Sequence, residues 1–203
     1  MIMKLITNTQ ITVDGVMQAN GGNNPEFDPG FDRGGWALPV GDDESTGYIG
    51  EFYQRADAFL FGRRTYELFA GYWGGVRRDD VDDPFVSSLN SRPKFVASNT
   101  ITDPQWADTT VLSGDLESAI RELKAEPGGE LQVHGSGQLI RWLLEHELVD
   151  EMTLIVCPVI VGAGTRLFPE TGKDFALELV ESLRFPTGIL AQTYRPNGRP
   201  EYA

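Results

Sequence analysis

The chain has 203 residues, of which 40% are hydrophobic and 23% charged, so we expect one folded domain over residues 1–203 with a continuous core. The formal net charge of −13 argues against a nucleic-acid partner or an anionic membrane surface, because neither approaches an acidic protein without a strong basic patch. The single cysteine, Cys157, excludes an intrachain disulfide framework and a multi-cysteine metal site. The N-terminus lacks a signal-peptide core and no apolar run is long enough to span a membrane, so we expect a cytoplasmic protein.

Strand and helix patterns alternate along most of the chain. In chain order we expect a strand at 5–13, a helix at 48–55, a strand at 58–61, a helix at 65–69, a strand at 94–97, a helix at 116–123, a strand at 131–134, a helix at 139–144, and strands at 152–156, 175–183 and 189–194. Gly71, Gly74 and Gly75 are expected to stop the second helix, and the strand at 175–183 is expected to expose one face. This order indicates an α/β fold with a mainly parallel central sheet and a C-terminal antiparallel hairpin.

A long connection at residues 17–47 interrupts this pattern. It is rich in Gly, Asn, Asp and Pro and is much longer than an ordinary loop. It is either disordered or a functional lid. We favour the lid, because Phe27, Phe31, Trp36 and Leu38 lie within it and a solvated linker has little use for four large apolar side chains.

The sequence Gly62-Arg63-Arg64-Thr65 stands between a buried strand and a helix. At such a junction, backbone N–H groups and the positive end of the helix dipole point above the sheet, and Arg and Thr add further donors, so a phosphate would be well held. For the isolated motif, a solvated surface pair of arginines is about equally probable, since short motifs match by chance.

The sequence His134-Gly135-Ser136-Gly137-Gln138 forms a second strand-to-helix turn. Glycines let the backbone come close to a pyrophosphate. The dinucleotide fingerprint is incomplete, because Ile140 stands where its third glycine is expected, and alone a structural turn is favoured roughly two to one. Two such turns at the carboxyl ends of parallel strands together predict a dinucleotide or another phosphorylated ligand, since ligands of open α/β sheets bind there.

These motifs, in this order, resemble the dihydrofolate reductase superfamily, and more narrowly its branch that contains the reductase domain of bacterial riboflavin biosynthesis. The resemblance spans nearly the whole chain and is carried by Gly62-Arg63-Arg64-Thr65-Tyr66-Glu67, Lys94 to Asn99, His134 to Gly137, Leu148 to Met152, Pro158 to Gly164 and Leu167-Phe168-Pro169. It implies a three-layer fold with a mainly parallel sheet and a C-terminal hairpin, which agrees with the pattern above. It also implies NADPH as the cofactor, a small-molecule substrate and a homodimer.

The resemblance implies cofactor-binding roles for residues that match the family's motifs. Arg63 or Arg64 would meet the adenosine 2′-phosphate together with Ser98 and Asn99. The pyrophosphate and nicotinamide would lie near Val13, Gly62, Thr65, Gly135, Ser136, Gly137 and Gln138. Val13-Asp14-Gly15 resembles the stretch that leads into the loop over the nicotinamide, and Asp14-Gly15 is the form seen in the riboflavin branch.

The chain also departs from the family in two places. The substrate carboxylate of dihydrofolate reductases has no unambiguous counterpart among Asp42, Asp43, Glu44 and Glu51, so folate specificity is doubtful. The H-x-E and P-C-x-x-C pattern of the zinc deaminase domain is missing, which excludes deamination, and no metal is expected. His134 is expected to be a packing or turn residue rather than a base, because a lone histidine without a spaced partner carries little information.

The expected activity is hydride transfer from NADPH to a small polar heterocycle, such as the pyrimidine 5-amino-6-(5-phosphoribosylamino)uracil that the riboflavin branch reduces. Asp14 is the first candidate for supplying the proton and Glu51 the reserve. Two alternatives remain: a non-catalytic NADPH-binding homodimer that has kept the fold, and a sensor of a phosphorylated ligand.

Overall fold

The computed structural model describes residues 2–75 and 83–203. Its strands are β1 (Lys4–Thr12), β2 (Ala56–Gly62), β3 (Lys94–Ala97), β4 (Thr109–Leu112), β5 (Glu130–His134), β6 (Glu151–Cys157), β7 (Leu177–Arg184) and β8 (Leu190–Pro196). Its helices are α1 (Asp43–Gln54), α2 (Arg63–Trp73), α3 (Pro84–Ser91), α4 (Leu116–Ala125) and α5 (Gly137–Glu145), and a 3-10 turn, η1, covers Leu38–Val40. Among the described residues no helix is long and apolar enough to cross a membrane.

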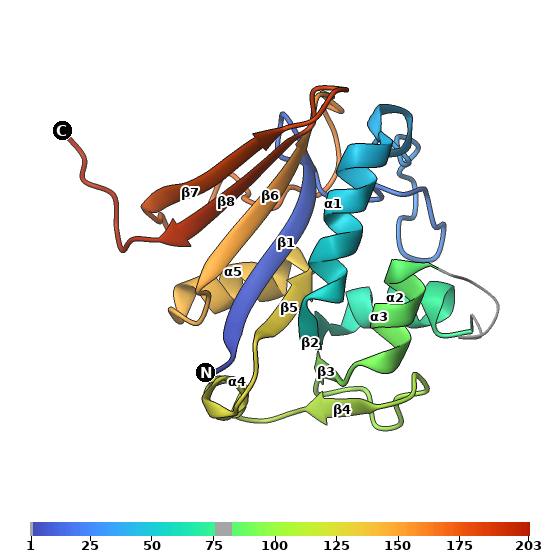
Figure 1. The fold of residues 1–203 in the computed structure, drawn as a ribbon, viewed down its shortest axis with the longest axis vertical. Coiled ribbons are helices and arrows are strands. Elements are labelled where there is room, and N and C mark those ends of the chain that lie inside the picture. The colour runs from blue at the N-terminus through green and yellow to red at the C-terminus, as the bar shows by residue number, and fades with distance from the viewer. Residues whose placement is uncertain (1, 76–82) are drawn as a thin grey trace.

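In the part of the chain that the structure describes, the strands form one eight-stranded sheet in the order β4-β3-β2-β5-β1-β6-β8-β7 (Figure 1). The first six strands of the sequence run parallel to one another, whereas β8 runs antiparallel to β6 and β7 antiparallel to β8. The predicted α/β fold with a C-terminal hairpin is therefore confirmed.

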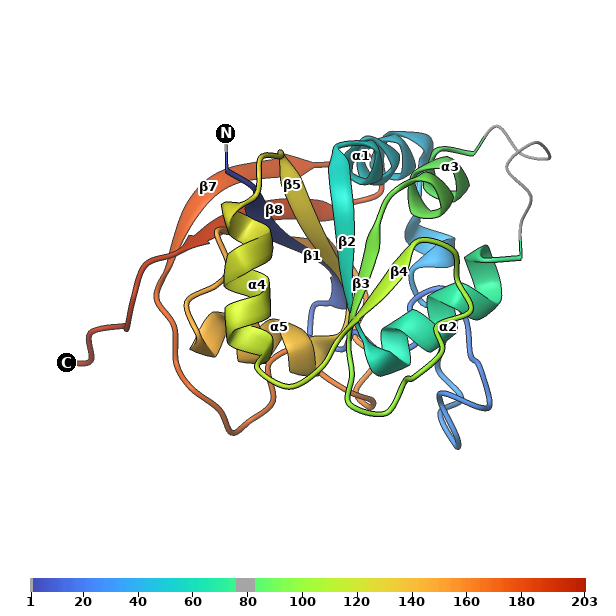
Figure 2. The ribbon, with the colours of Figure 1, turned by 90° about the horizontal axis from the view of Figure 1, so that it is seen from below.

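Helices cover both faces of this sheet and make three layers. Phe59 and Phe61 of β2 pack against aromatic side chains of α1, α2 and α3. Ala58 and Leu60, which alternate with them, join a larger aliphatic core with α4 and α5. Figure 2 shows α1 and α3 on one side of the strands and α4 and α5 on the other.

Two helices differ from their predicted bounds for local reasons. Helix α1 begins at Asp43 rather than at the predicted Tyr48, because Asp42 and Ser45 form a reciprocal capping box. Helix α2 runs from Arg63 through Gly71 to Trp73 and has Gly74 as its C-cap, so the prediction was right for Gly74 and wrong for Gly71. One glycine costs a helix about 1 kcal/mol, which the packing of Tyr66 in the aromatic core offsets.

Three features of the sheet and its connections were not predicted. Helix α3 has Pro84 in its first turn and an Asp83 cap, but its Ser- and Asn-rich sequence hides the helical period. Strand β4 has only four residues. Strand β7 is exposed on both faces, so the prediction of a single exposed face was wrong.

The sheet topology has a switch point between β1 and β5. The connection that follows β1 passes through α1 to β2, which lies on the far side of β5 in the sheet. The connection that follows β5 passes through α5 to β6, which lies on the far side of β1. The two connections leave neighbouring parallel strands in opposite directions and on opposite faces. Ligands of open α/β sheets bind at such a switch point, outside the carboxyl ends of the strands.

Candidate functional site

The two predicted glycine turns lie side by side at the carboxyl ends of β2 and β5. The backbone amide of Gly62 donates a hydrogen bond of 3.1 Å to Oγ of Ser136, which joins the turns directly. A Cβ atom at position 62 would lie 2.2 Å from that oxygen, so only glycine fits there. Gly62 has φ −76°, an angle that any residue can adopt. The close approach of the second turn, and not the backbone angle, therefore explains why a glycine stands here.

The helices that follow these turns differ from their neighbours at their N-termini. Asp42, Asp83 and Asp115 cap α1, α3 and α4, whereas no side chain of the described residues caps α2 or α5. Ser136 stands at the cap position of α5, but its hydroxyl is bonded to Gly62. The first N–H groups of both helices therefore remain as donors for an anion.

The backbone conformation of the second turn is unusual. Gly135 has φ +70° and Ser136 has φ +60°, which places both residues in the left-handed region. A non-glycine residue there costs about 1 kcal/mol or more and is held by its surroundings, here by the bond to Gly62. Gly137, the next residue, does not have a positive φ.

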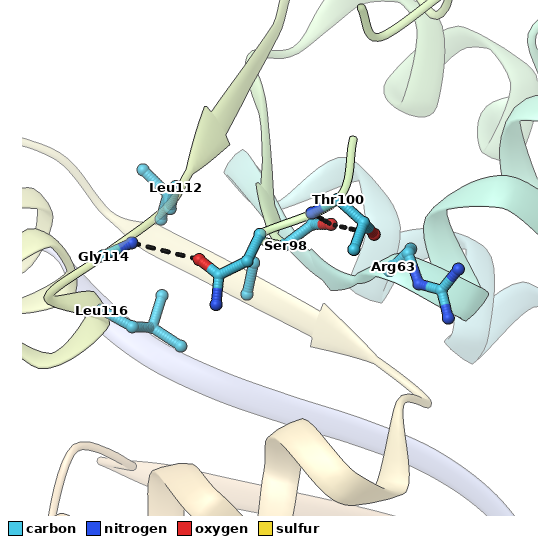
Figure 3. A pocket seen from close by; sticks show the side chains of 8 residues that line it. Arg63, Ser98, Thr100, Leu112, Gly114 and Leu116 are labelled. Atoms are coloured by element: carbon cyan, nitrogen blue, oxygen red, sulfur yellow. Dashed lines mark hydrogen bonds between the residues drawn. The ribbon is translucent and has the colours of Figure 1, made fainter. Parts of the chain in front are cut away.

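A pocket of about 300 Å³ lies beside the first turn, at the ends of β3 and β4 (Figure 3). Its lining combines Arg63 with polar and apolar residues, and comprises Arg63, Ala97, Ser98, Asn99, Thr100, Leu112, Gly114 and Leu116. This volume is at the lower end of the range for small-ligand sites, so it suits one end of a dinucleotide rather than the whole.

Internal hydrogen bonds hold the polar rim of this pocket. Oγ of Ser98 accepts from the amides of Thr100 and Ile101, both at 3.1 Å. Oδ1 of Asn99 accepts from the amide of Gly114 at 3.2 Å and thereby links the β3 and β4 ends. These bonds shape the loop around the pocket before any ligand arrives.

The adjacent arginines point to different partners. Arg63 lines the pocket and pairs with Glu67 one turn along α2, at 3.8 Å. Arg64 instead reaches the 17–47 segment, where its Nη2 lies 3.4 Å from Oδ1 of Asp28. The sequence left either arginine open as the phosphate contact, and of the two only Arg63 lines the pocket.

The 17–47 segment is folded against the site. Met17 lies over the second turn, since a Cβ atom at Gly137 would come within 2.7 Å of its Sδ. Trp36 is buried and donates from Nε1 to the carbonyl of Gln18 at 2.8 Å. Phe31 is partly buried and packs against the hydrophobic cluster that contains Trp36. Leu38 is exposed, so not all four apolar side chains of the segment are buried.

The remaining cofactor-site candidates surround the two turns. Thr65 lies in the first turn of α2, half-buried, and Gln138 is exposed near the start of α5. Val13 is exposed just after β1, and its amide donates to the carbonyl of Val159.

Asp14 is tied to the loop that follows β6. Its carboxylate accepts from Oγ1 of Thr12 at 2.6 Å and from the amides of Val161 and Gly162 at 3.1 and 2.8 Å. The Thr12 hydroxyl, more than the two amides, lowers the pKa of Asp14 to about 2. Asp14 is therefore an ionised anchor of this loop at neutral pH.

The other acid named from the sequence, Glu51, is exposed on α1. It lies near the end of that helix that leads into the start of β2. The glycine turns lie at the opposite edge of the sheet, where β2 and β5 end. The structure therefore does not bring Glu51 together with the other candidates.

His134 is buried and stacked. Its ring lies 3.8 Å from that of Tyr53, and Nε2 is 2.9 Å from Oε1 of Gln132. Burial lowers the pKa of His134 to about 3, so the imidazole is neutral at physiological pH. The prediction of a packing role agrees with these contacts.

Three residues of the site were missed in the sequence. Met17 and Asp28 lie in the long segment, where no periodicity marks them. Asn8 of β1 is buried beside His134 in the sheet, and its Nδ2 has no partner among the described residues. An asparagine in the middle of a strand was the available signal, because a buried amide needs a partner.

Comparisons with known proteins show the family and the fold of this chain. The family model of the RibD C-terminal domain matches residues 3–191. Protein YyaP of Bacillus subtilis is 26% identical over 195 residues, which cover 96% of each chain. The solved structure of a protein named for riboflavin biosynthesis from Shewanella sp. PV-4 is 26% identical, with a TM-score of 0.72 over 96% of this chain and 99% of that one. The fold also matches dihydrofolate reductase from Enterococcus faecalis, solved with NADP(H), at 14% identity and a TM-score of 0.60 over 97% and 99% of the two chains.

Proposed function

Because the chain belongs to the RibD C-terminal domain family, whose fold is that of reductases, we propose that it is an NADPH-dependent reductase of a small heterocyclic substrate such as a pyrimidine. One observation carries the proposal: the Gly62–Ser136 hydrogen bond brings together the N-termini of α2 and α5, neither of which has a side-chain cap. They lie beside a pocket that Arg63 lines. This arrangement supplies donors for a pyrophosphate and a cation for one further phosphate.

The residues present fit NADPH along a path across the strand ends. Arg63, with Ser98 and Asn99, would hold the 2′-phosphate, and Leu112 and Leu116 offer an apolar wall beside it. The N–H groups at the starts of α2 and α5, with Thr65, would hold the pyrophosphate. The turn 135–137, with Gln138 and Val13, would border the nicotinamide end.

When bound, the cofactor would supply the hydride, and the protein's part is binding, orientation and exclusion of water. Met17 lies over the turn 135–137, and the buried Trp36 fastens the same segment. The segment would thus cover the reacting groups and keep solvent out.

The accompanying proton needs a donor other than ionised Asp14. A carboxylate with a pKa of about 2 is almost fully deprotonated at neutral pH. We therefore assign Asp14 the role of holding the loop at 158–164 beside the site, and we propose a water as the source of the proton. Glu51 is not used in this scheme.

A second copy of the chain is proposed to cover the C-terminal hairpin. Leu177, Leu179, Val180 and Leu183 of β7 are all exposed, and β7 is the edge strand of the sheet. An apolar edge strand left uncovered is an aggregation hazard, which a homodimer would remove.

The test is a titration with NADPH followed by oxidation assays over a panel of pyrimidines, pteridines and simple carbonyls. The proposal expects NADPH to bind more tightly than NADH and at least one pyrimidine to be reduced. Binding without turnover of any substrate would favour the alternative of a non-catalytic NADPH-binding homodimer. Absence of NADPH binding by folded protein would overturn the proposal.

A further inference from the structure

Asp28 is a buried acid in a segment that is otherwise largely exposed. Its exposure is 8%, and its carboxylate lies between two donors from different parts of the fold. Nε2 of Gln18 donates to its Oδ1 at 2.9 Å, and Nη2 of Arg64 lies 3.4 Å from the same oxygen. Asp28 thus connects the 17–47 segment to the first turn of α2.

Gln18 in turn fastens the segment to the body of the protein. Its Oε1 accepts from the amide of Thr165, and its backbone carbonyl accepts from Nε1 of Trp36, both at 2.8 Å. Met17, one residue earlier, lies over Gly137. A change at Asp28 therefore reaches the part of the segment that covers the second turn.

The two charges depend on one another unequally. A carboxylate taken out of water is costly unless hydrogen bonds and a counter-charge compensate, so Asp28 needs Arg64 while the segment is closed. Arg64 is 62% exposed and is well solvated when the segment opens. Breaking the pair therefore destabilises mainly the closed segment and not helix α2.

We propose that Asp28 and Arg64 form a latch that holds the 17–47 segment closed over the cofactor site. The adjacent arginines then divide two tasks, because Arg63 contacts the ligand's phosphate while Arg64 is a positioning residue that acts through the segment. The effect on cofactor binding rests on the proposed function, whereas the latch itself exists without any ligand.

The first experiment measures hydrogen–deuterium exchange of the free protein in peptides covering residues 17–41. Asp28→Asn and Arg64→Gln should each accelerate exchange by roughly three- to ten-fold, the range for a charged contact with one exposed partner, and the double variant should add little further. Arg64→Lys, which keeps the charge, should restore slow exchange in part. Asp32→Asn is the matched control, because it removes the same charge from an exposed site in the same segment.

The second experiment measures dissociation constants of NADPH and NADH for the same variants. Loss of the latch should change both by a common factor and leave their ratio unchanged, whereas Arg63→Gln should change the ratio. Exchange that stays unaltered in Asp28→Asn, that rises equally in Asp32→Asn, or that adds fully in the double variant would overturn the latch. A protein that binds neither cofactor would overturn the proposed function, while the exchange data would still decide on the latch.

Discussion

The amide of Gly62 and the hydroxyl of Ser136 meet at 3.1 Å, across strands that follow one another in the sheet but lie 74 positions apart in the chain. This bond uses the hydroxyl that would otherwise cap α5, and it supports a serine with φ +60°. The conformational free energy spent on the left-handed Ser136 is thereby linked to two helix N-termini, of α2 and α5, that lie together without side-chain caps. Such a linkage is typical of sites where strain is retained for binding.

We predict that Gly62→Ala destabilises the protein by about 1 to 3 kcal/mol, because the new methyl group would lie 2.2 Å from Ser136 Oγ. The backbone at Gly62, with φ −76°, accepts alanine, so the clash alone is responsible. Ser136→Gly removes the obstructing hydroxyl and relieves the left-handed serine. The double variant should then be more stable than Gly62→Ala alone in urea denaturation, and simple additivity would contradict the assigned contact.

We predict that Arg63→Gln weakens NADPH binding by roughly ten- to a hundred-fold and NADH binding much less, because a charge-assisted bond to a phosphate is worth about 1.5 to 3 kcal/mol. Quenching of tryptophan fluorescence measures both affinities. Glu67→Gln is the control, since it removes the helical partner of Arg63 and leaves Arg63 itself unchanged. An equal loss for both cofactors would mean that Arg63 does not contact the 2′-phosphate.

We predict that Asp14 makes stability depend on pH in acid. The folded-state pKa is lowered from 3.8 to about 2, so the contribution of Asp14 is fully present above about pH 4 and is lost as the pH falls through 2. Asp14→Asn should lower the free energy of unfolding at pH 6 and should flatten its decrease between pH 4 and 2. Urea denaturation at several pH values checks this, and parallel curves for the two proteins would contradict it.

His134 supplies a second pH-dependent contribution, at higher pH. Burial lowers its pKa from 6.5 to about 3, so the unfolded chain binds a proton that the folded protein excludes. The contribution of His134 to the free energy of unfolding is therefore fully present above about pH 6.5 and decreases as the pH falls toward 3. His134→Gln should weaken the slope of stability against pH in this range, and an unchanged slope in a folded variant would contradict the buried neutral imidazole.

Much of the architecture could be predicted from the sequence because local signals were consistent. The helix at 116–123 carries its Asp115 cap and apolar period together, and α4 was found with nearly those bounds. Helix α3 and strand β4 were missed because tertiary packing determines them. Leu89 of α3 is buried among aromatic residues from other elements, and the four residues of β4 are held by pairing with β3.

The candidate site was predictable only in part, for a similar reason. The two glycine turns can be recognised from their composition. The hydrogen bond between Gly62 and Ser136 cannot, because it depends on β2 and β5 being neighbours in the sheet. The choice between Arg63 and Arg64 depends on where the 17–47 segment folds, and no periodicity encodes that. The pKa of Asp14 depends first on the Thr12 hydroxyl, which is near in sequence, and then on the amides of Val161 and Gly162, which are close in space and distant in sequence.

The hairpin predicts the assembly of the protein in solution. We expect a homodimer of twice 22.4 kDa, in which the exposed apolar side chains of β7 are covered by a second copy. Light scattering coupled to size-exclusion chromatography measures the mass over a range of concentrations.

Leu179→Arg should raise the dimer dissociation constant by roughly ten- to a hundred-fold, because a buried leucine is worth about 1.5 to 3 kcal/mol and the arginine would add an unpaired charge. Leu38→Arg is the matched control, since Leu38 is also an exposed leucine but lies in η1 and not in β7. Circular dichroism must show that both variants are folded. A wild-type protein that is monomeric at micromolar concentration, or equal dissociation of the two variants, would mean that β7 is not the interface and that its apolar residues need another explanation.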